Sequence, residues 1–411
     1  MVVGMIARSS RMLAQQVQNG AMNYQKLLTI KQVNDVLAQH VSALPSAKNI
    51  VYDPKRLHSP TDSLDSVVIP LGSEPSIRLQ YTNKANVTRF GKILEDLDTF
   101  AVWLAYKHNQ GPEVPMGQPN HPPMIAVTAC VDKINLQNRV IRSDLDIVMS
   151  GMVTWVGRSS AEITMHLTQK YAEGDLRDLL TARFVMVSME PDGKKSVPNV
   201  GLKLETDEDR AWFQKGEYAK NERLSREQNS LFKTLPTEIE RTMIHDIFLK
   251  AINPENMRGR LPANHMWMRD AKVENLVNCY PVKRNLYGKI FGGYLMRTAY
   301  ETALCNAAIL SKCTPQVMAA DSVVFRKSVE IGSLLLLSSQ VCYSTDRFMQ
   351  LSVNAEVLDI ESGNHETTNT FQFTFKADKE VPVVIPKSYA DGMLYLNARR
   401  HFDSSAHAHH V

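Results

Sequence analysis

The sequence predicts an α+β protein made of two similar halves, each with a long helix followed by a run of antiparallel strands. A short motif occurs twice, as Gly91-Lys92-Ile93-Leu94 and as Gly288-Lys289-Ile290-Phe291. Apolar residues recur at helical spacing after each copy, and alternating or β-rich segments follow. One helix for each run of strands favours a strongly curved sheet that wraps its own helix.

Each copy of the motif is expected to open a helix. The apolar stripe of the first helix consists of Leu94, Leu97, Ala101, Leu104 and Ala105, and that of the second of Leu295, Ala299, Ala303 and Ala307. A stripe of this kind buries one face of a helix. We therefore expect both helices to lie against sheets.

The strands are expected in matching order in the two halves. They are predicted at 125–128, 147–156, 163–167 and 182–188 in the first half, and at 317–320, 334–343, 349–357 and 368–375 in the second. Asp132-x-Ile134-x-Leu136 corresponds to Asp321-x-Val323-x-Phe325, and Arg158 corresponds to Arg347. The two halves therefore share a pattern of residue types, although few residues are identical.

A charged, helix-prone segment separates the two halves. The stretch from Glu205 to Phe248 is predicted to be a linker helix outside the sheets, with a binding arm as the alternative. The predicted organisation is a transit region at 1–34, a first domain at 75–204, a helical linker at 205–260, a second domain at 261–385 and a C-terminal tail at 386–411.

The N-terminus has the composition of a mitochondrial transit peptide. The first acidic residue is Asp35, whereas Arg8, Arg11, Lys26 and Lys31 precede it. Basic, acid-poor and partly amphipathic segments are typical of such peptides. The sequence predicts the mitochondrial matrix, with a flexible or helical extension as the alternative.

Composition excludes several other classes of protein. With 44% hydrophobic and 22% charged residues in 411, the chain is typical of a globular protein, and a net charge of +4 does not favour nucleic-acid binding. The apolar run Leu334–Leu337 is too short to span a membrane. Scattered cysteines without ligand spacing predict reduced thiols, and His407, His409 and His410 are interpreted as a frayed tail. We expect no metal and no cofactor.

Three segments carry a family resemblance. The longest is Asn285-Leu286-Tyr287-Gly288-Lys289-Ile290-Phe291-Gly292-Gly293-Tyr294-Leu295-Met296, which resembles the helix-entry signature of hotdog acyl-CoA thioesterases. Val156-Gly157-Arg158-Ser159-Ser160 resembles the loop before a central strand, and the stretch from Arg89 to Asp98 adds further support. Together they resemble the mitochondrial double-hotdog branch, the acyl-coenzyme A thioesterase 9 family, over residues 75–385. The resemblance implies two fused hotdog domains, hydrolysis of acyl-CoA to a free acid and CoA, and a homo-oligomer.

Thioester hydrolysis needs a base for the attacking water and donors for the developing oxyanion. The resemblance implies that Asn285 is catalytic, whereas its position alone indicates a turn or cap residue. Gly292 and Gly293 let the backbone approach the thioester, and their N–H groups can point at its oxygen. Close helix packing is the alternative role of the two glycines.

The base is harder to predict, because the position of the acid in single-hotdog relatives holds Tyr300 in one half and Trp103 in the other. Asp98 is the preferred candidate, since it lies on or beside the apolar stripe, where burial raises the pKa of a carboxyl group. Glu95, Asp96 and Glu301 are the remaining candidates, although Glu95 and Asp96 also suit a helix N-terminus.

The two halves are not equivalent, because Glu95-Asp96 is taken to correspond to Gly292-Gly293. We expect one working site, built from Asp98 and Asn285. Water activated by Asp98, or attack by the carboxylate itself to give a mixed anhydride, would use the same residues.

The phosphates of CoA require cationic or N–H donors. Arg158, Ser159, Ser160 and Arg347 are predicted to bind them, with solvated loop residues as the alternative. Two other functions keep the fold: a non-catalytic acyl-CoA sensor, and a hotdog enoyl-CoA hydratase. The hydratase usually requires a histidine near the acid, and no such cluster follows either helix.

Overall fold

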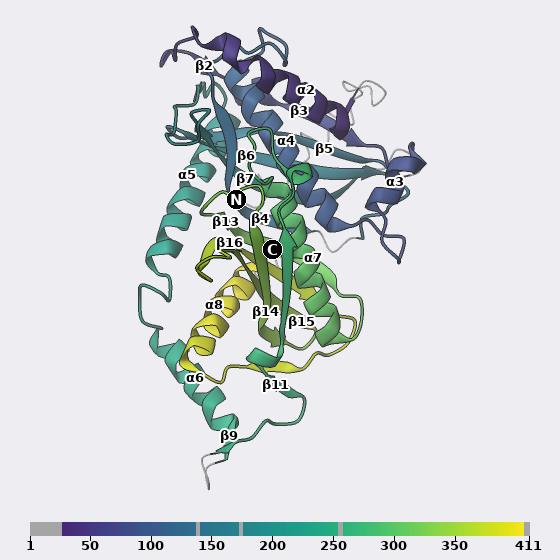
Figure 1. Cartoon of the computed structure of the whole chain (residues 1–411), viewed down its shortest axis with the longest axis vertical. Helices are drawn as coiled ribbons and strands as arrows, with labels where there is room; N and C mark the ends of the chain where they lie inside the picture. Colours follow the sequence, from purple (N-terminus) through teal and green to yellow (C-terminus); the bar gives the residue numbers. More distant parts are fainter. Residues whose placement is uncertain (1–26, 137–139, 172–175, 254–257, 407–411) are drawn as a thin grey trace. The chain divides into compact units, whose positions relative to one another are not determined.

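The computed structural model describes residues 27–136, 140–171, 176–253 and 258–406. The predicted transit segment up to residue 26 and the three C-terminal histidines lie outside the described residues. The chain divides into two compact units, and Figure 1 labels their helices and strands. The first comprises Met1–Glu217 and Val282–Arg297, and the second comprises Tyr218–Pro281 and Thr298–Val411.

The first unit contains a sheet that is antiparallel except at one edge. Its strands, in spatial order, are β1 (Leu28–Thr29), β3 (Asp65–Ile69), β5 (Ile147–Val156), β6 (Ser160–Lys170), β7 (Leu176–Met189) and β4 (Ile125–Leu136). Among the described strands of this sheet, only β1 and β3 run parallel. The strands predicted from alternation are confirmed, each with longer or equal bounds.

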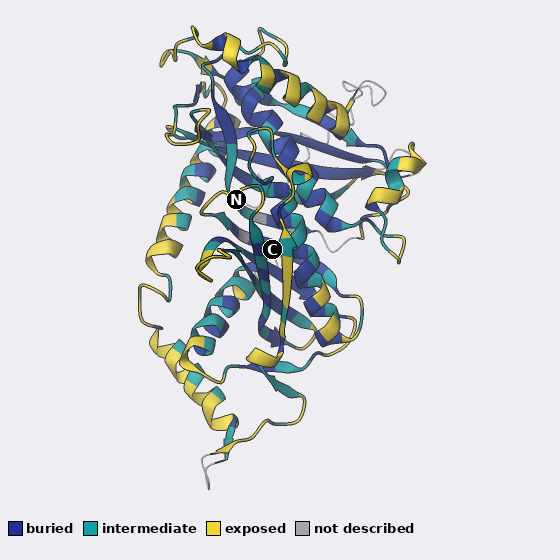
Figure 2. Ribbon diagram, in the orientation of Figure 1, coloured by how far each residue is buried: buried dark blue, intermediate teal, exposed yellow. Residues whose placement is uncertain are grey.

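The helix α4 (Phe90–Gln110) is the core of the first unit. It packs against β4, β5, β6 and β7, and α2 (Ile30–Ala43) also contacts it. Figure 2 shows α4 buried along nearly its whole length. Gly151 makes this approach possible, because a Cβ there would lie 2.8 Å from the Leu104 side chain. The helix ends where Gly111 adopts a φ of 80°.

The second unit repeats this arrangement. Its strands, in spatial order, are β13 (Gln316–Phe325), β16 (His365–Lys376), β15 (Phe348–Leu358), β14 (Leu334–Thr345) and β12 (Lys272–Asn278), all antiparallel. The helix α7 (Gly292–Ser311) packs here through Tyr300, whose ring contacts Phe373 and Phe375. Both units are therefore curved sheets around a helix, and the prediction of an α+β fold with two hotdog domains is confirmed.

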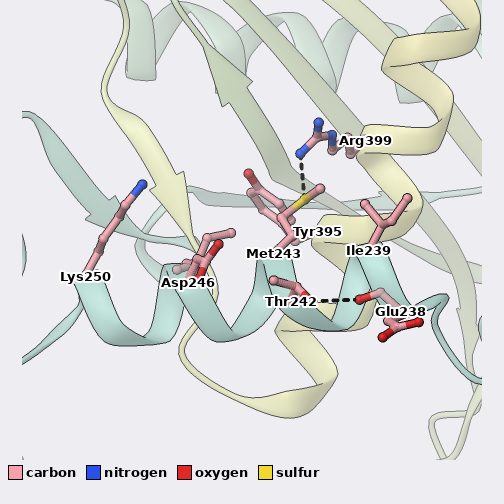
Figure 3. Close-up of a pocket in the computed structure, with 9 residues that line it drawn as sticks. Glu238, Ile239, Thr242, Met243, Asp246, Lys250, Tyr395 and Arg399 are labelled. Carbon is pink, nitrogen blue, oxygen red and sulfur yellow. Dashed lines mark hydrogen bonds between the residues drawn. The ribbon is translucent and has the colours of Figure 1, made fainter.

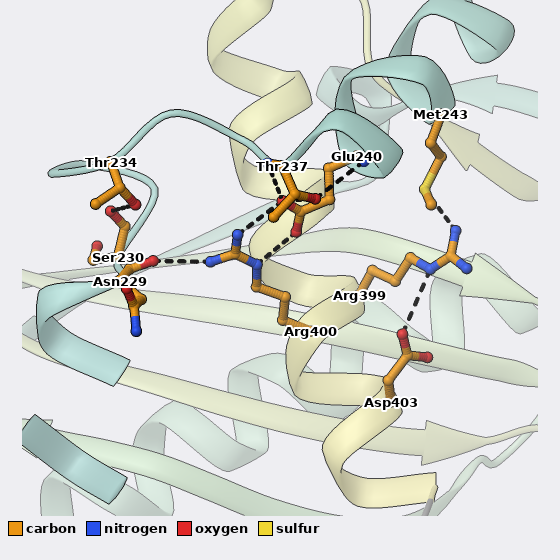
Figure 4. Close-up of polar contacts among 9 residues, drawn as sticks. All are labelled: Asn229, Ser230, Thr234, Thr237, Glu240, Met243, Arg399, Arg400 and Asp403. Atoms are coloured by element: carbon orange, nitrogen blue, oxygen red, sulfur yellow. Dashed lines mark hydrogen bonds and ion pairs between the residues drawn. The ribbon is translucent and has the colours of Figure 1, made fainter. Parts of the chain in front are cut away.

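Three further long helices complete the fold. α5 (Asp207–Gln228) and α6 (Glu238–Lys250) occupy the charged segment, and α8 (Tyr389–Ala406) packs on β14, β15 and β16. In the second unit, Arg400 pairs with Glu240 at 2.6 Å and joins α8 to α6 (Figure 4). A groove of about 590 Å³ lies beside this contact, with Met243 and Arg399 in its lining (Figure 3). None of the predicted site residues lines this groove.

The remaining elements are short. Within the described ranges they are α3 (Pro75–Tyr81), the parallel pair β2 (Leu57–His58) and β8 (Gly201–Leu202), the antiparallel pair β9 (Ile252–Asn253) and β10 (Arg258–Gly259), the parallel pair β11 (His265–Trp267) and β17 (Val383–Ile385), and four 3₁₀ turns at 44–47, 60–63, 268–270 and 281–283. No described helix has both the length and the apolar character needed to cross a bilayer.

The structure corrects the register of the internal repeat. The Asn83 and Asn285 side chains organise identical turns, because each accepts two backbone N–H groups from residues two and four positions later. The helices α4 and α7 begin at the same distance after these turns. Gly91 therefore corresponds to Gly293, and the predicted pairing of Gly91 with Gly288 is wrong.

Candidate active site

Asp98 lies on the inner face of α4 and is 1% exposed. Its carboxylate accepts two hydrogen bonds, from the Thr128 hydroxyl on β4 at 2.5 Å and from the Gly293 backbone N–H at 2.7 Å. Burial raises the pKa of Asp98 to about 6, and the two hydrogen bonds oppose this rise. The carboxylate is thus ionised at neutral pH and still basic enough to take a proton from water.

Gly293 brings the start of α7 against the backbone of α4. A Cβ at this position would lie 2.9 Å from the Glu95 Cα and 3.0 Å from its carbonyl oxygen, so only glycine fits without a shift. Gly293 therefore serves close helix packing, and its N–H donates to Asp98. Gly292 is the first residue of α7, where backbone N–H groups have no partner within the helix.

Glu95 holds this junction together. Its carboxylate pairs with Lys92 at 2.5 Å and with Arg297 of α7 at 3.2 Å. Burial tends to raise the pKa of Glu95, but the two cations outweigh burial and lower it. A carboxylate bound in this way is a weak base, so Glu95 suits a role in positioning α7.

The other two carboxylates have different surroundings. Asp96 is buried and accepts a hydrogen bond from the Tyr81 hydroxyl at 2.6 Å, and burial raises its pKa to about 7. It precedes Asp98 by two residues, which turns the two side chains about 200° apart around the helix axis, so they point in nearly opposite directions. Glu301 is half-buried on α7 and belongs to the second unit.

Asn285 lies in the turn that precedes α7 and belongs to the same compact unit as Asp98. Its Oδ1 accepts the N–H groups of Tyr287 and Lys289, at 2.9 and 3.0 Å. Gly288 completes the turn with a φ of 78°. The oxygen is fully used by the turn, which leaves the amide N–H₂ as the group that can donate to a ligand.

The predicted phosphate ligands lie in two equivalent hairpins, one in each unit. Arg158 is exposed between β5 and β6, with Ser159 and Ser160 beside it, and Arg347 is exposed between β14 and β15. Along the sheet of the first unit, Thr128 pairs with Met186, which pairs with Ala161. The Arg158 hairpin thus lies at the level of Thr128, about 10 Å away across two strand spacings.

The corrected repeat shows how the positions of Asp98 and Thr128 differ in the second unit. Asp98 corresponds to Tyr300, which packs among Phe373 and Phe375. β4 and β13 have matching bulges, after Thr128 and after Val317, so Thr128 corresponds to Val317. At these two described positions the second unit therefore has a tyrosine and a valine in place of the acid and the hydroxyl. The predictions that Trp103 occupies the acid position and that Glu95-Asp96 matches Gly292-Gly293 are wrong.

Three residues of this site were not found from the sequence. Thr128 looks like any β-favouring residue of a strand, and Arg297 and Tyr81 look like ordinary polar residues of helices. Their contacts join elements that are far apart in the chain, and periodicity carries no such signal. The internal repeat in its correct register would have singled out Asp98 against Tyr300.

Comparison with known proteins identifies the family. No protein-family model matches the chain. Acyl-coenzyme A thioesterase 9, mitochondrial, from Bos taurus is 39% identical over 96% of this chain and 92% of its own length. The Homo sapiens protein of the same name is 40% identical, over 93% of this chain and 83% of its own length. A solved structure titled a putative oleoyl thioesterase, from Lactobacillus plantarum, is 12% identical with a TM-score of 0.46, over 76% of this chain and 96% of that one.

The two relatives are named as mitochondrial proteins, which groups this chain with mitochondrial enzymes. Their identity extends over nearly all of this chain and most of theirs, as the signature around Asn285 predicted. This protein belongs to the acyl-coenzyme A thioesterase 9 family.

Proposed function

We propose that this thioesterase hydrolyses acyl-CoA at one site in its first unit, with Asp98 as the base and Asn285 as a donor to the thioester. One observation carries the proposal. The buried carboxylate of Asp98 is held by Thr128 and by the first turn of α7, the helix that the Asn285 turn precedes. A base, a hydroxyl and a helix N-terminus in one place suit acyl transfer to water.

The reaction follows from the charges of these groups. Asp98 takes a proton from water as the water oxygen attacks the thioester carbon, and the carbonyl oxygen becomes an oxyanion. The Asn285 amide and the N-terminus of α7 stabilise this negative charge. The carbon–sulfur bond then breaks, and the proton on Asp98 passes to the sulfur of CoA. Attack by Asp98 itself, with a mixed anhydride that water cleaves, uses the same groups.

The nucleotide end of CoA is assigned to the Arg158 hairpin. Its guanidinium is exposed at the level of Thr128, about two strand spacings away, and can pair with phosphate oxygens. The hydroxyls of Ser159 and Ser160 lie in the same hairpin. Arg347 stands in the matching hairpin of the second unit, where the acid is replaced by Tyr300.

Substitution of Asn285 tests the proposal. We expect Asn285→Ala to lower kcat about 100-fold, because one donor to the oxyanion is lost. Thiol release from a chain-length series of acyl-CoAs measures this loss and gives the acyl preference. Asn83→Ala is the matched control, since Asn83 makes the same turn hydrogen bonds before α4. Equal kcat values in the two variants would contradict the assignment.

The pH dependence follows from the pKa of Asp98. Because the free base must be ionised, kcat/KM is expected to fall about tenfold per pH unit below pH 6 and to level off above it. Thr128→Val removes a hydrogen bond that stabilises the carboxylate, so the midpoint of this profile shifts to higher pH. An unshifted midpoint in Thr128→Val would argue against Asp98 as the titrating group.

The location of the protein in the cell and its assembly complete the proposal. The acid-poor, basic N-terminus supports import into the mitochondrial matrix, and protection from added protease in intact mitochondria but not in detergent would test it. We also propose a homo-oligomer, because hotdog sheets pair by their edges in the related family. Sedimentation at the mass of a single chain would contradict this assembly.

A further inference from the structure

Two tyrosines connect the Asn285 turn to the core of the first unit. Tyr287 follows Asn285 by two residues, and its backbone N–H donates to the Asn285 side chain at 2.9 Å. Its hydroxyl contacts the hydroxyl of Tyr106, which lies on α4 and is completely buried. The turn is thus tied to the helix that carries Asp98.

The Met124 carbonyl determines which of the two tyrosine hydroxyls donates to the other. Tyr106 donates its hydroxyl hydrogen to the Met124 carbonyl oxygen at 3.1 Å. The Tyr106 oxygen is therefore the acceptor for the Tyr287 hydroxyl. Burial raises the pKa of Tyr287 to about 12, so both phenols keep their protons at neutral pH. The arrangement has one hydrogen-bond pattern and not two alternating ones.

The Tyr106 ring is fixed by two histidines. The His40 and His121 rings lie 5.0 and 5.7 Å from it between centroids, and their Nε2 atoms are 3.0 Å apart. The Gly117 N–H donates to His40 Nδ1, and His121 Nδ1 contacts the Pro122 carbonyl. His40 then carries its proton on Nε2 and donates it to His121. Burial lowers the pKa of His40 to about 4, so this cluster is neutral.

The helix that carries Asp98 also binds the Tyr287 hydroxyl, through Tyr106. α4 carries both Asp98 and Tyr106, and Met124 directly precedes β4, the strand of Thr128. We propose that Tyr106 and Tyr287 are positioning residues that fix the Asn285 amide relative to the Asp98 carboxylate. This inference rests on the proposed function. Neither tyrosine touches the reacting atoms, and both act through the Asn285 turn.

The test uses the full chain with Tyr106→Phe and Tyr287→Phe, each of which removes one hydroxyl and keeps the ring. We expect kcat to fall about tenfold, because a small misplacement of a donor is costly, while KM stays within about twofold. The double variant is expected to be no slower than either single one. In an Asn285→Ala background, Tyr287→Phe has no further effect. Tyr389→Phe, at an exposed tyrosine in the second unit, is the control.

The outcomes separate this inference from the proposed function. Wild-type kcat in both tyrosine variants, together with a large loss in Asn285→Ala, would overturn the inference alone. So would a loss in Tyr287→Phe that persists undiminished when Asn285 is already alanine. Wild-type turnover in Asn285→Ala would refute the proposed function and the inference with it. Tyr287 lies in a half-buried turn, so Tyr287→Phe carries the test if Tyr106→Phe does not fold.

Discussion

Asp98→Asn is expected to lower kcat for acyl-CoA hydrolysis roughly a thousandfold, more than any other substitution proposed for this site. The amide cannot take a proton from water. It also has one acceptor oxygen for two donors, the Thr128 hydroxyl and the Gly293 N–H. Thiol release with the purified variant at saturating acyl-CoA measures the loss. Binding of a non-hydrolysable acyl-CoA analogue reports whether the site is still formed.

Two controls make this result specific. Asp96→Asn changes a buried acid on the same helix that is bound to Tyr81, and it is expected to keep measurable turnover. Tyr300→Phe changes the matching position of the second unit, and it is also expected to keep turnover. If either variant lost as much activity as Asp98→Asn, the assignment of one base in one unit would be wrong.

The stability of Asp98→Asn provides a further check. An acid whose pKa rises on folding is ionised more readily in the unfolded chain, so it costs stability as the pH rises from 3.8 through about 6. At pH 7 the neutral amide removes this cost while losing one hydrogen bond. The thermal midpoint is therefore expected to stay close to that of the wild type, and inactivity cannot then be attributed to unfolding.

Local periodicity predicted much of the fold. The stripe through Leu94 and Ala101 predicted α4, and it also placed Asp98 at the edge of a buried face. The eight strands predicted from alternation are all present. Residues 30–43 and 389–406 form helices that the sequence analysis did not predict, and both pack on elements that are distant in the chain.

The register of the internal repeat could not be determined from residue identities alone. The turn before α4 reverses at Asn86, with a φ of 57°, and the turn before α7 reverses at Gly288, with a φ of 78°. Asparagine and glycine both tolerate this conformation, so the same turn forms from different residues in the two halves. The conspicuous match of Gly-Lys-Ile lies inside the helix in one half and before it in the other.

The roles of the three carboxylates of α4 also depended on partners far away in sequence. Glu95, Asp96 and Asp98 are equally plausible bases from composition alone. Arg297 binds the first, Tyr81 the second, and Thr128 with Gly293 the third. Asp96 and Asp98 are both buried with neutral donors, but Asp98 alone of the three accepts a hydrogen bond from the first turn of α7, the helix that follows the Asn285 turn, which is why we propose Asp98 as the base.

Gly293→Ala tests whether the approach of α7 to α4 is required for catalysis. The new methyl group would lie 2.6 Å from a Phe291 ring carbon and 2.9 Å from the Glu95 Cα, and the second of these is backbone that cannot move alone. We expect a loss of about 1–3 kcal/mol in the free energy of unfolding. We also expect a fall of about 100-fold in kcat, because the N–H that holds Asp98 is displaced.

Gly392→Ala is the matched control, since Gly392 is also near the start of a helix and a methyl group there would meet only Ile244 at 3.6 Å. It is expected to leave kcat unchanged and to raise stability by up to about 1 kcal/mol, as alanine favours helices over glycine. Denaturant unfolding and thiol release, measured on both variants, separate the two effects of Gly293. A Gly293→Ala variant that loses stability but keeps kcat would show that the junction is structural only, and that the Asp98 carboxylate does not depend on the Gly293 N–H.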